Sequence, residues 1–319
     1  MDKTDLKILE KLDSNARISI ISLAKNLRIS KDIAHYRIKK LEEQRVIIDS
    51  HSIISPRKLG YVYHRLLLKF VPLNRDQEQH WMEWIKKCPQ IIWVGVCDGE
   101  WNSIMTICTK NNVELNQTYN DLLMKFGSLI LKKELIAIVE IQIFNRKFLN
   151  PEKKITYNLK SNFNDVEEKI DKKDILLIQE MRKDAKTRVV DLTKKINLSA
   201  VAISARLRQL EKKKIIIAYR PRIDYTKFGL QNYEVLISLR NPSHKTQIIT
   251  YYQYHPYCET IIELMGHYDI QLTFLLPNPR EFKNILADLR NQFSESIMEY
   301  HPLAADQEFS LSPIEGTKF

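Results

Sequence analysis

The sequence repeats itself at a constant offset of 169 residues, and no other feature constrains the fold as strongly. Both copies keep their spacing from a first amphipathic segment to a Leu-Gly or Phe-Gly pair, without insertion or deletion. The matching segments are residues 2–9 and 171–178, 15–17 and 184–186, 23–27 and 192–196, 37–42 and 206–211, and 58–60 and 227–229. Chance similarity does not hold one register over such a length, so we expect the same structural unit twice.

Each copy begins with a pattern typical of three short helices followed by two strands. The third helix of each copy follows a serine that suits an N-cap, and it has one apolar face. These positions are Ser30, Ala34, Ile38 and Leu41 in the first copy and Ser199, Ile203, Leu207 and Leu210 in the second. The β-branched segments 46–48 and 52–54 predict two strands around residues 49–51. This layout predicts a winged helix-turn-helix in each copy.

The outer face of each third helix carries the side chains that we expect to contact DNA. A helix-turn-helix lays this helix in the major groove, where basic groups meet phosphates or guanines and small ones meet thymine methyls. The candidates in the first copy are Ser30, Lys31, His35, Tyr36, Arg37, Lys39 and Lys40. Those in the second are Ser199, Ala200, Val201, Ser204, Arg206 and Arg208. The alternative is a unit that serves only as a scaffold or in dimerisation.

Positive charge is concentrated in the same two segments. Of the chain's formal net charge of +11, residues 1–58 supply 13 Lys and Arg against 8 Asp and Glu, and residues 169–227 supply 17 against 7. Residues 228–319 are acidic, with 6 against 11. Two separate basic blocks favour a polyanion such as double-stranded DNA as partner, although a solvated basic face would have the same composition.

Behind each helical segment the pattern changes to strand–helix–strand–strand–helix–strand. The expected elements are residues 61–71, 77–87, 91–96, 103–109, 113–126 and 130–144, then 233–239, 246–254, 260–265, 269–276, 280–293 and a less regular 296–303. This order is that of the ferredoxin-like βαββαβ unit, whose open sheet face favours dimerisation. The predicted fold class is α+β, with two winged helix-turn-helix domains alternating with two ferredoxin-like domains.

Together these motifs resemble the Lrp/AsnC (leucine-responsive/asparagine-operon regulator) family over almost the whole chain, twice. The pattern is carried by Asp5, Ile8-Leu9, Ala16-Arg17, Leu23-Ala24, Ser30, Arg37-Ile38, Leu41-Glu42, Ile47, Leu59-Gly60 and Gly266-x-Tyr268-Asp269. The resemblance implies a transcriptional regulator in which a DNA reader is joined to a domain that senses amino acids or other small molecules. It also implies effector-binding residues at the turn between the middle strands. These are Gly99, Trp101 and Asn102 in the first copy and Gly266, Tyr268 and Asp269 in the second. Alternatively, both glycines only make a tight turn.

Three positions depart from that family's pattern. Asn102 replaces an aspartate, which removes a carboxylate able to pair with an ammonium group of an effector. Arg45 and Lys214 stand after the third helices, where the family usually has a glycine in the left-handed conformation. If that conformation is kept, each costs up to about 1 kcal/mol.

The predicted domains are residues 1–57 and 169–226 for the winged helix-turn-helices and residues 58–150 and 227–319 for the ferredoxin-like domains. Residues 151–168 form a predicted linker, which at ~3.3 Å per residue could extend ~60 Å. That reach lets the two halves pair as a pseudo-dimer within one chain. Because the two third helices differ in sequence, such a pair would read an asymmetric DNA site. The resemblance also implies assembly into homo-oligomers.

The sequence gives little support to other classes of function. No apolar run approaches the ~18 residues of a transmembrane helix, and no signal segment is evident, so a cytoplasmic protein without membrane partners is expected. The four cysteines, Cys88, Cys97, Cys108 and Cys258, lack metal-site spacing, and no catalytic arrangement stands out. We therefore expect no metal, no cofactor and no enzymatic activity. Two alternatives stay open: a siroheme decarboxylase-like enzyme, which shares the architecture, and an architectural protein that compacts DNA.

Overall fold

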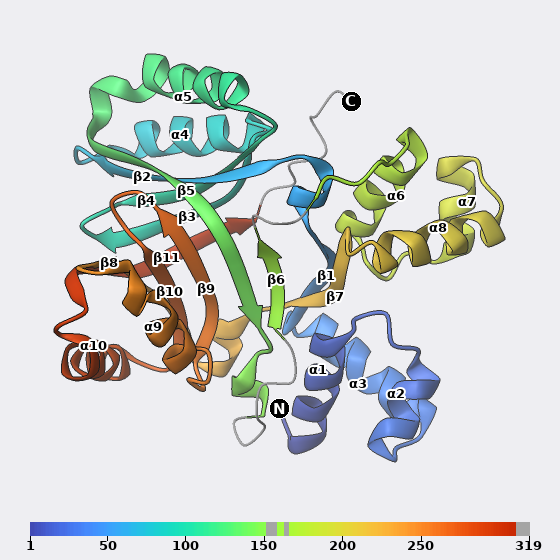
Figure 1. Cartoon of the computed structure of the whole chain (residues 1–319). Coiled ribbons are helices and arrows are strands. Elements are labelled where there is room, and N and C mark those ends of the chain that lie inside the picture. The colour runs from blue at the N-terminus through green and yellow to red at the C-terminus, as the bar shows by residue number, and fades with distance from the viewer. Residues whose placement is uncertain (151–157, 163–165, 311–319) are drawn as a thin grey trace. The chain divides into compact units, whose positions relative to one another are not determined.

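The computed structural model describes residues 1–150, 158–162 and 166–310, and these divide into two compact units (Figure 1). The first, here called the helical unit, draws on the described residues 1–59, 143–150, 158–159 and 166–230. The second, here called the sheet unit, draws on the described residues 60–142, 160–162 and 231–310. Each copy of a domain is therefore grouped with its repeat rather than with its neighbour in the sequence.

The helical unit contains the two three-helix bundles that the sequence predicts. They comprise α1 (Lys3–Ser14), α2 (Ile20–Leu27) and α3 (Lys31–Glu43), and α6 (Lys172–Lys183), α7 (Val189–Ile196) and α8 (Ala200–Lys212). Ser30 and Ser199 cap α3 and α8, because each hydroxyl accepts a hydrogen bond from the third backbone N–H of its helix. Ala34 and Leu41 on α3 are buried, as are Ile203, Leu207 and Leu210 on α8. The predicted caps and apolar faces are confirmed.

The predicted wing is wrong in detail: each copy contributes one strand instead of a hairpin. Strand β1 (Ile47–Ile54) runs without reversal through residues 49–51 and pairs antiparallel with β7 (Ile216–Ile223) of the other copy. Residues 49–51 include no glycine, proline or asparagine to favour a tight hairpin turn, so the chain stays extended. Its backbone groups then find partners in the unlike copy, which sequence periodicity does not show.

Matching contacts on both sides of this ladder relate the two bundles by a pseudo-twofold axis. The backbone N–H of Ala16 donates to the carbonyl of Tyr219, and the equivalent N–H of Ala185 donates to the carbonyl of Ser50. Helix α1 packs on β7, and α6 packs on β1, with the ladder between the bundles in Figure 1. The two helix-turn-helix copies thus form one body within the chain.

The sheet unit contains both predicted βαββαβ copies. The first consists of β2 (Val62–Phe70), α4 (Arg75–Lys87), β3 (Ile91–Gly99), β4 (Ser103–Thr109), α5 (Asn112–Phe126) and β5 (Ile130–Phe144). The second consists of β8 (Gln231–Leu239), α9 (Lys245–Tyr252), β9 (Cys258–Met265), β10 (Ile270–Leu276), α10 (Pro279–Phe293) and β11 (Ile297–Ser310). The bounds of β4 and β5 are those predicted, whereas β11 continues beyond the predicted segment 296–303. The predicted α+β fold class is confirmed.

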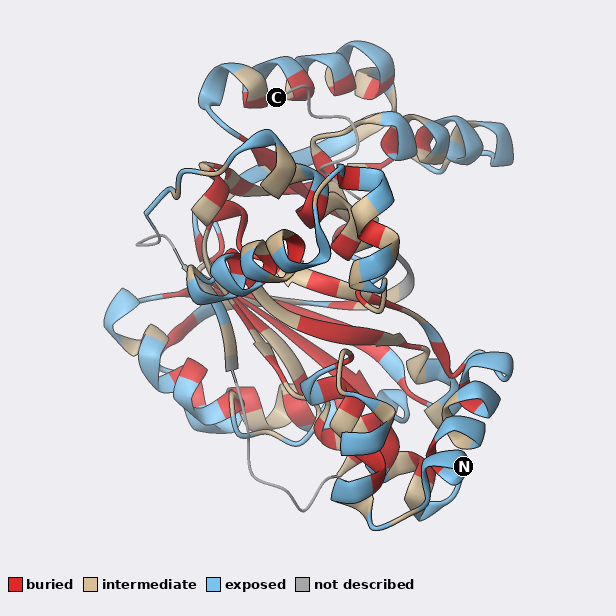
Figure 2. Ribbon diagram, turned by 90° about the vertical axis from the view of Figure 1, so that its right-hand side faces the viewer, coloured by how far each residue is buried: buried red, intermediate tan, exposed pale blue. Residues whose placement is uncertain are grey.

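The strands of both copies join into one continuous sheet. Its order is β2-β4-β3-β11-β8-β10-β9-β5-β6, and an additional β2–β5 pairing closes the ring. β11 pairs antiparallel with both β3 and β8, so it bridges the copies, and β5 bridges β2 and β9 in the same way. Figure 2 shows that most strand residues are buried, whereas each helix has both buried and exposed residues. The open sheet face that predicted dimerisation is therefore covered by the other copy.

The remaining elements are short. Strand β6 (Asn158–Asn162) lies beside β5, inside the segment predicted as a linker, most of which falls outside the described residues. The 3-10 helices are η1 (Pro56–Leu59), η2 (Gly127–Leu129), η3 (Lys147–Leu149), η4 (Tyr225–Phe228) and η5 (Pro242–His244). In the described part of the chain, no helix has both the length and the apolar character needed to span a membrane.

Candidate DNA-binding helices and effector turns

Helices α3 and α8 present most of the predicted DNA-contacting side chains to solvent. On α3 the exposed positions are Lys31, His35, Tyr36, Lys39 and Lys40, and on α8 they are Ala200, Val201 and Arg208. Tyr36 is 66% exposed and Val201 is 81% exposed, so both present apolar surface to solvent. Ser204 is half-buried, and its hydroxyl donates to the carbonyl of Ala200 at 2.8 Å. Both helices therefore offer a mixed basic and apolar surface at the end that would enter a groove.

Two predicted DNA-contacting residues, Arg37 and Arg206, are engaged inside their own bundles instead. Nη1 of Arg37 lies 2.6 Å from a carboxylate oxygen of Asp2 and 2.7 Å from one of Asp5. Arg206 repeats the arrangement with Asp171 and Asp174, at 2.8 Å and 2.7 Å. These aspartates form the capping boxes of α1 and α6, so each arginine ties the third helix to the start of the first. Both guanidiniums thus have carboxylate partners within their own bundles, and a contact of either with DNA stays a prediction.

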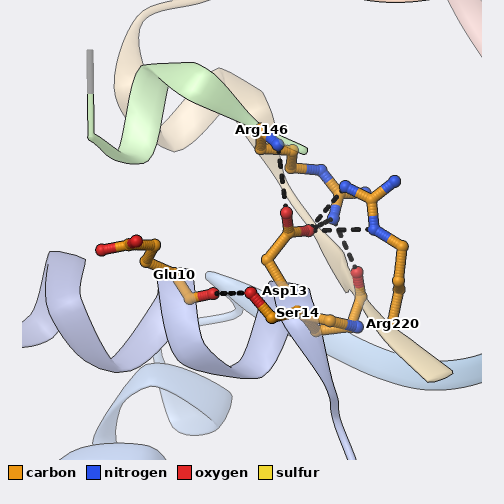
Figure 3. A network of polar contacts seen from close by, with 6 residues as sticks. Glu10, Asp13, Ser14, Arg146 and Arg220 are labelled. Carbon is orange, nitrogen blue, oxygen red and sulfur yellow. Dashed lines mark hydrogen bonds and ion pairs between the residues drawn. The ribbon is translucent and has the colours of Figure 1, made fainter. Parts of the chain in front are cut away.

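A buried ion-pair network joins the two bundles (Figure 3). Oδ1 of Asp13, on α1, lies 2.7 Å from Nη2 of Arg220 on β7 and 2.6 Å from Nη1 of Arg146. The side chains of Asp13 and Arg220 are each 3% exposed. Burial raises the pKa of Asp13, but Arg220 and Arg146 outweigh it and lower that pKa to about 2. Asp13 and Arg220 are 207 residues apart in the sequence, so no local pattern predicted that they would pair.

The first predicted effector turn is built into the sheet. Gly99 has φ +141°, and a Cβ there would lie 2.7 Å from Cδ2 of Leu303, so close strand packing requires the glycine. Oδ1 of Asn102 accepts a hydrogen bond from the backbone N–H of Phe70 at 2.7 Å. Trp101 is 5% exposed, and its Nε1 donates to the hydroxyl of Tyr268 at 3.1 Å. Gly99, Trp101 and Asn102 thus each have a structural role in the sheet unit.

The second turn repeats the same construction. A Cβ on Gly266 would lie 3.1 Å from Cγ2 of Ile136, and Oδ2 of Asp269 accepts from the backbone N–H of Leu239 at 2.8 Å. Tyr268 is fully buried, and burial raises the pKa of its hydroxyl to about 12. Lys245 lies 3.6 Å from the other oxygen of Asp269. Asn102 and Asp269 therefore play the same backbone-capping part, which explains why an amide replaces the carboxylate without breaking the turn.

A pocket of about 640 Å³ lies beside the first turn. It is lined by Lys69, Phe70, Val71, Pro72, Leu73, Glu78, Trp81, Met82, Val96, Cys97, Asp98, Asn102, Ser103 and Leu131. Of the predicted effector residues in the described chain, Asn102 alone lines it. Nζ of Lys69 donates to the carbonyl of Gly99 at 2.8 Å, so a cation stands at its rim. In the described residues no group of three His, Cys, Asp or Glu side chains is placed to hold a metal ion.

Comparison with known proteins assigns the family. Residues 1–48 match the winged helix-turn-helix DNA-binding family. An uncharacterised HTH-type transcriptional regulator of Pyrococcus abyssi is 32% identical over 125 residues, which are 38% of this chain and 81% of that protein. The transcriptional regulator AzlB of Bacillus subtilis is 30% identical over 126 residues, 39% of this chain and 80% of its own. The chain belongs to the Lrp/AsnC family of transcriptional regulators. Each relative matches less than half of this chain, as a tandem member of the Lrp/AsnC family requires.

A solved structure resembles this Lrp/AsnC protein over nearly its full length. The siroheme decarboxylase NirDL covers 97% of this chain and 93% of its own, with a TM-score of 0.68 and 13% sequence identity. At that identity the likeness concerns the fold alone.

The departures from the Lrp/AsnC pattern after the third helices keep the expected backbone. Arg45 and Lys214 both have φ +55°, in the left-handed region that the family's glycine adopts without strain. The backbone N–H of Arg45 donates to the carbonyl of Glu42, and that of Lys214 to the carbonyl of Glu211. The helix ends are thus conserved in shape although the residue type is unfavourable.

Proposed function

We propose that this protein is a transcriptional regulator that binds double-stranded DNA with α3 and α8 of one chain. The observation that carries the proposal is the β1–β7 ladder, which joins both helix-turn-helix copies in one unit. Lrp/AsnC membership and the two basic blocks support it. Within this unit α3 and α8 each expose basic and apolar side chains to solvent.

The two recognition helices carry different side chains at equivalent positions. The pairs related by the 169-residue offset are Lys31 and Ala200, His35 and Ser204, Tyr36 and Ala205, and Lys39 and Arg208. A long basic or aromatic group and a short side chain cannot read the same base edge. We propose that the chain recognises two unlike half-sites, so its operator is asymmetric.

A binding selection from randomised duplexes with the full chain tests this proposal. The expected consensus has two half-sites of different sequence in a fixed relative orientation, about one helical turn or a multiple of it apart. A perfect palindrome as the preferred site would contradict unlike reading. The ratio of specific to non-specific affinity at fixed salt separates a regulator from an architectural DNA-compacting protein, since a regulator binds its site at least ~10³-fold more tightly.

We propose further that the 640 Å³ pocket beside Asn102 takes a small zwitterion such as an amino acid. Lys69 and Asp98 at its rim supply one cation and one anion, and Trp81, Met82 and Leu73 supply an apolar floor. This combination suits a carboxylate, an ammonium group and an apolar side chain together. Isothermal titration of the full chain with each amino acid tests the pocket. A Lys69→Met variant should lose any binding that the wild type shows, and unchanged affinity would place the ligand elsewhere.

We propose that the protein is not an enzyme, although the fold of NirDL invites comparison. The tetrapyrrole substrate that siroheme decarboxylases act on carries several carboxylates, which need cationic partners. The described residues that line the 640 Å³ pocket include one lysine, no arginine and no histidine, while Glu78 and Asp98 add negative charge. Titration with an iron tetrapyrrole should leave its absorption spectrum unchanged. A shifted spectrum together with release of carbon dioxide would establish the enzymatic alternative.

A further inference from the structure

Two equivalent positions in the sheet unit carry opposite charges and are both buried. Arg65 on β2 and Glu234 on β8 are related by the 169-residue offset, and each is 3% exposed. The strand registers confirm the equivalence, because Arg65 faces Thr106 on β4 and Glu234 faces Thr273 on β10. The duplicated position thus holds a cation in one copy and a carboxylate in the other, inside the closed ring of strands.

The surroundings of these two side chains differ accordingly. Nη1 of Arg65 donates to Oγ1 of Thr106 at 2.5 Å, and its guanidinium lies 4.8 Å from the ring centre of Trp93. Oε2 of Glu234 accepts from Nε2 of Gln271 at 2.6 Å. The charge of Arg65 acts on Glu234 and partly offsets the cost of burying that carboxylate. Each charge therefore has a polar neighbour on the adjacent strand.

The helical unit shows the same exchange of sign. Asp13 on α1 pairs with Arg220 on β7, and the residues equivalent to them are Arg182 on α6 and His51 on β1. If two second copies paired with each other, Arg182 would take the place of Asp13 and face Arg220. Burial lowers the pKa of His51 to about 3, and nearby arginines add to this, so His51 stays neutral and leaves Arg182 without repulsion.

We propose that these buried charges make the two halves pair only as unlike copies. Pairing of two first copies would bring two Arg65 guanidiniums into the ring, and pairing of two second copies would bring in two Glu234 carboxylates. Buried like charges are strongly unfavourable, whereas in an unlike pair each charge offsets part of the other's burial cost, so the charges discriminate between pairings more than they add stability. The charges thus direct a first copy to a second copy, and the covalent link supplies that second copy within the same chain. This inference rests on the strand pairings and is independent of DNA binding.

Two single charge reversals in the full chain give a direct test. A Glu234→Arg chain contains two arginines at the paired positions, and an Arg65→Glu chain contains two glutamates. Each alone should lose soluble yield or melt roughly 5–10 °C below the wild type. When the two chains are co-expressed with different tags, the first copy of each complements the second copy of the other. Soluble two-tag complexes should then form in large excess over those of co-expressed wild-type chains. A variant that fails to fold alone is still informative, because the experiment measures the soluble complex that the two co-expressed variants form.

The double reversal Arg65→Glu with Glu234→Arg restores complementarity within one chain and should recover most of the lost Tm. The matched control is the exposed pair Lys132–Glu100, at 2.6 Å, whose reversals Lys132→Glu and Glu100→Lys should change neither Tm nor exchange. The proposal is overturned if the single reversals melt like the wild type, or if neither the mixture nor the double reversal recovers what the single reversals lose.

Discussion

The indole Nε1 of Trp101 donates a hydrogen bond to the hydroxyl of Tyr268 at 3.1 Å, although these residues stand at equivalent positions of the two copies. The same hydroxyl lies 3.2 Å from Nδ1 of His301 on β11. Both rings are buried. The turns assigned to effector binding by family resemblance thus contact each other within the sheet unit.

Removing this hydrogen bond should destabilise the sheet unit without changing its fold. Tyr268→Phe leaves the buried indole N–H of Trp101 without its acceptor, which should lower the free energy of unfolding by about 1–3 kcal/mol. Urea denaturation of Tyr268→Phe, Trp101→Phe and the double variant measures the effect. Because both changes remove the same bond, their costs should not add. Tyr254→Phe, at a 66% exposed site, is the control and should be neutral. Additive costs would show that the bond does not couple the copies.

Lys39 should affect DNA binding, whereas Arg37, two residues away on α3, should affect thermal stability. Lys39 is 67% exposed on its side chain, so Lys39→Ala should weaken DNA binding and reduce the magnitude of the salt slope by about 1. Arg37 is tied to Asp2 and Asp5, so Arg37→Ala should lower the melting temperature and leave the salt slope unchanged. Filter binding between 50 and 200 mM salt, with parallel thermal melts, tests both. A reduced salt slope for Arg37→Ala would show that Arg37 contacts DNA.

If α3 and α8 read different half-sites, a substitution in one helix should change the base preference at one half-site only. Tyr36→Ala gives α3 the residue that α8 has at position 205, and it removes a 66% exposed aromatic ring. A binding selection with this variant should change base preference in one half of the operator by ~1–3 kcal/mol per base pair and leave the other half as it was. Changes in both halves would mean that the two helices share one recognition surface.

Local sequence signals predicted most of this fold, and the failures have a common cause. Ser30 and Ser199 as caps, and the bounds of β4 and β5, follow from residues close in sequence. The wing was wrong because β1 finds its partner in β7, more than 160 residues away. Arg37 has the sequence character of a DNA contact, and only the fold brings Asp2 and Asp5 within reach.

The buried charges mark the limit of sequence interpretation for the candidate sites. The alignment of Arg65 with Glu234 is visible in the repeat, yet a charge reversal between copies looks like ordinary divergence until the strands are paired. The glycines of both turns were assigned to an effector by resemblance, but their closest neighbours are Leu303 and Ile136 of the bridging strands. The pocket beside Asn102 is lined by residues of α4 and of four strands, so no single sequence motif predicts it.

Glu234 should make stability depend on pH in an unusual direction. Burial raises the pKa of Glu234 from 4.5 to about 7, although Arg65 and Gln271 oppose the shift. The folded state therefore holds the proton more tightly than the unfolded chain, so this group's contribution is complete below pH ~4.5 and is lost as pH rises through ~7. Its loss amounts to about 3 kcal/mol at most. Urea unfolding from pH 5 to 8 should show this decline in the wild type relative to Glu234→Gln. The titrations of Asp13 and His51 are common to both proteins and cancel in the difference. A constant difference across this range would contradict the shift.

Glycine at the two left-handed positions should stabilise the protein. Arg45 and Lys214 have φ +55°, where a side chain costs up to about 1 kcal/mol that glycine avoids. Part of that gain is offset because glycine makes the unfolded chain more flexible, so Arg45→Gly and Lys214→Gly should each raise the free energy of unfolding by about 0.5 kcal/mol. The sites lie in different bundles, so the double variant should gain the sum of both. Gln44→Gly is the matched control: with φ −76° it has no strain to relieve and should lose stability. If Arg45→Gly and Gln44→Gly destabilise the protein equally, side-chain contacts at position 45 outweigh the backbone strain, and the helix end is held by more than its geometry.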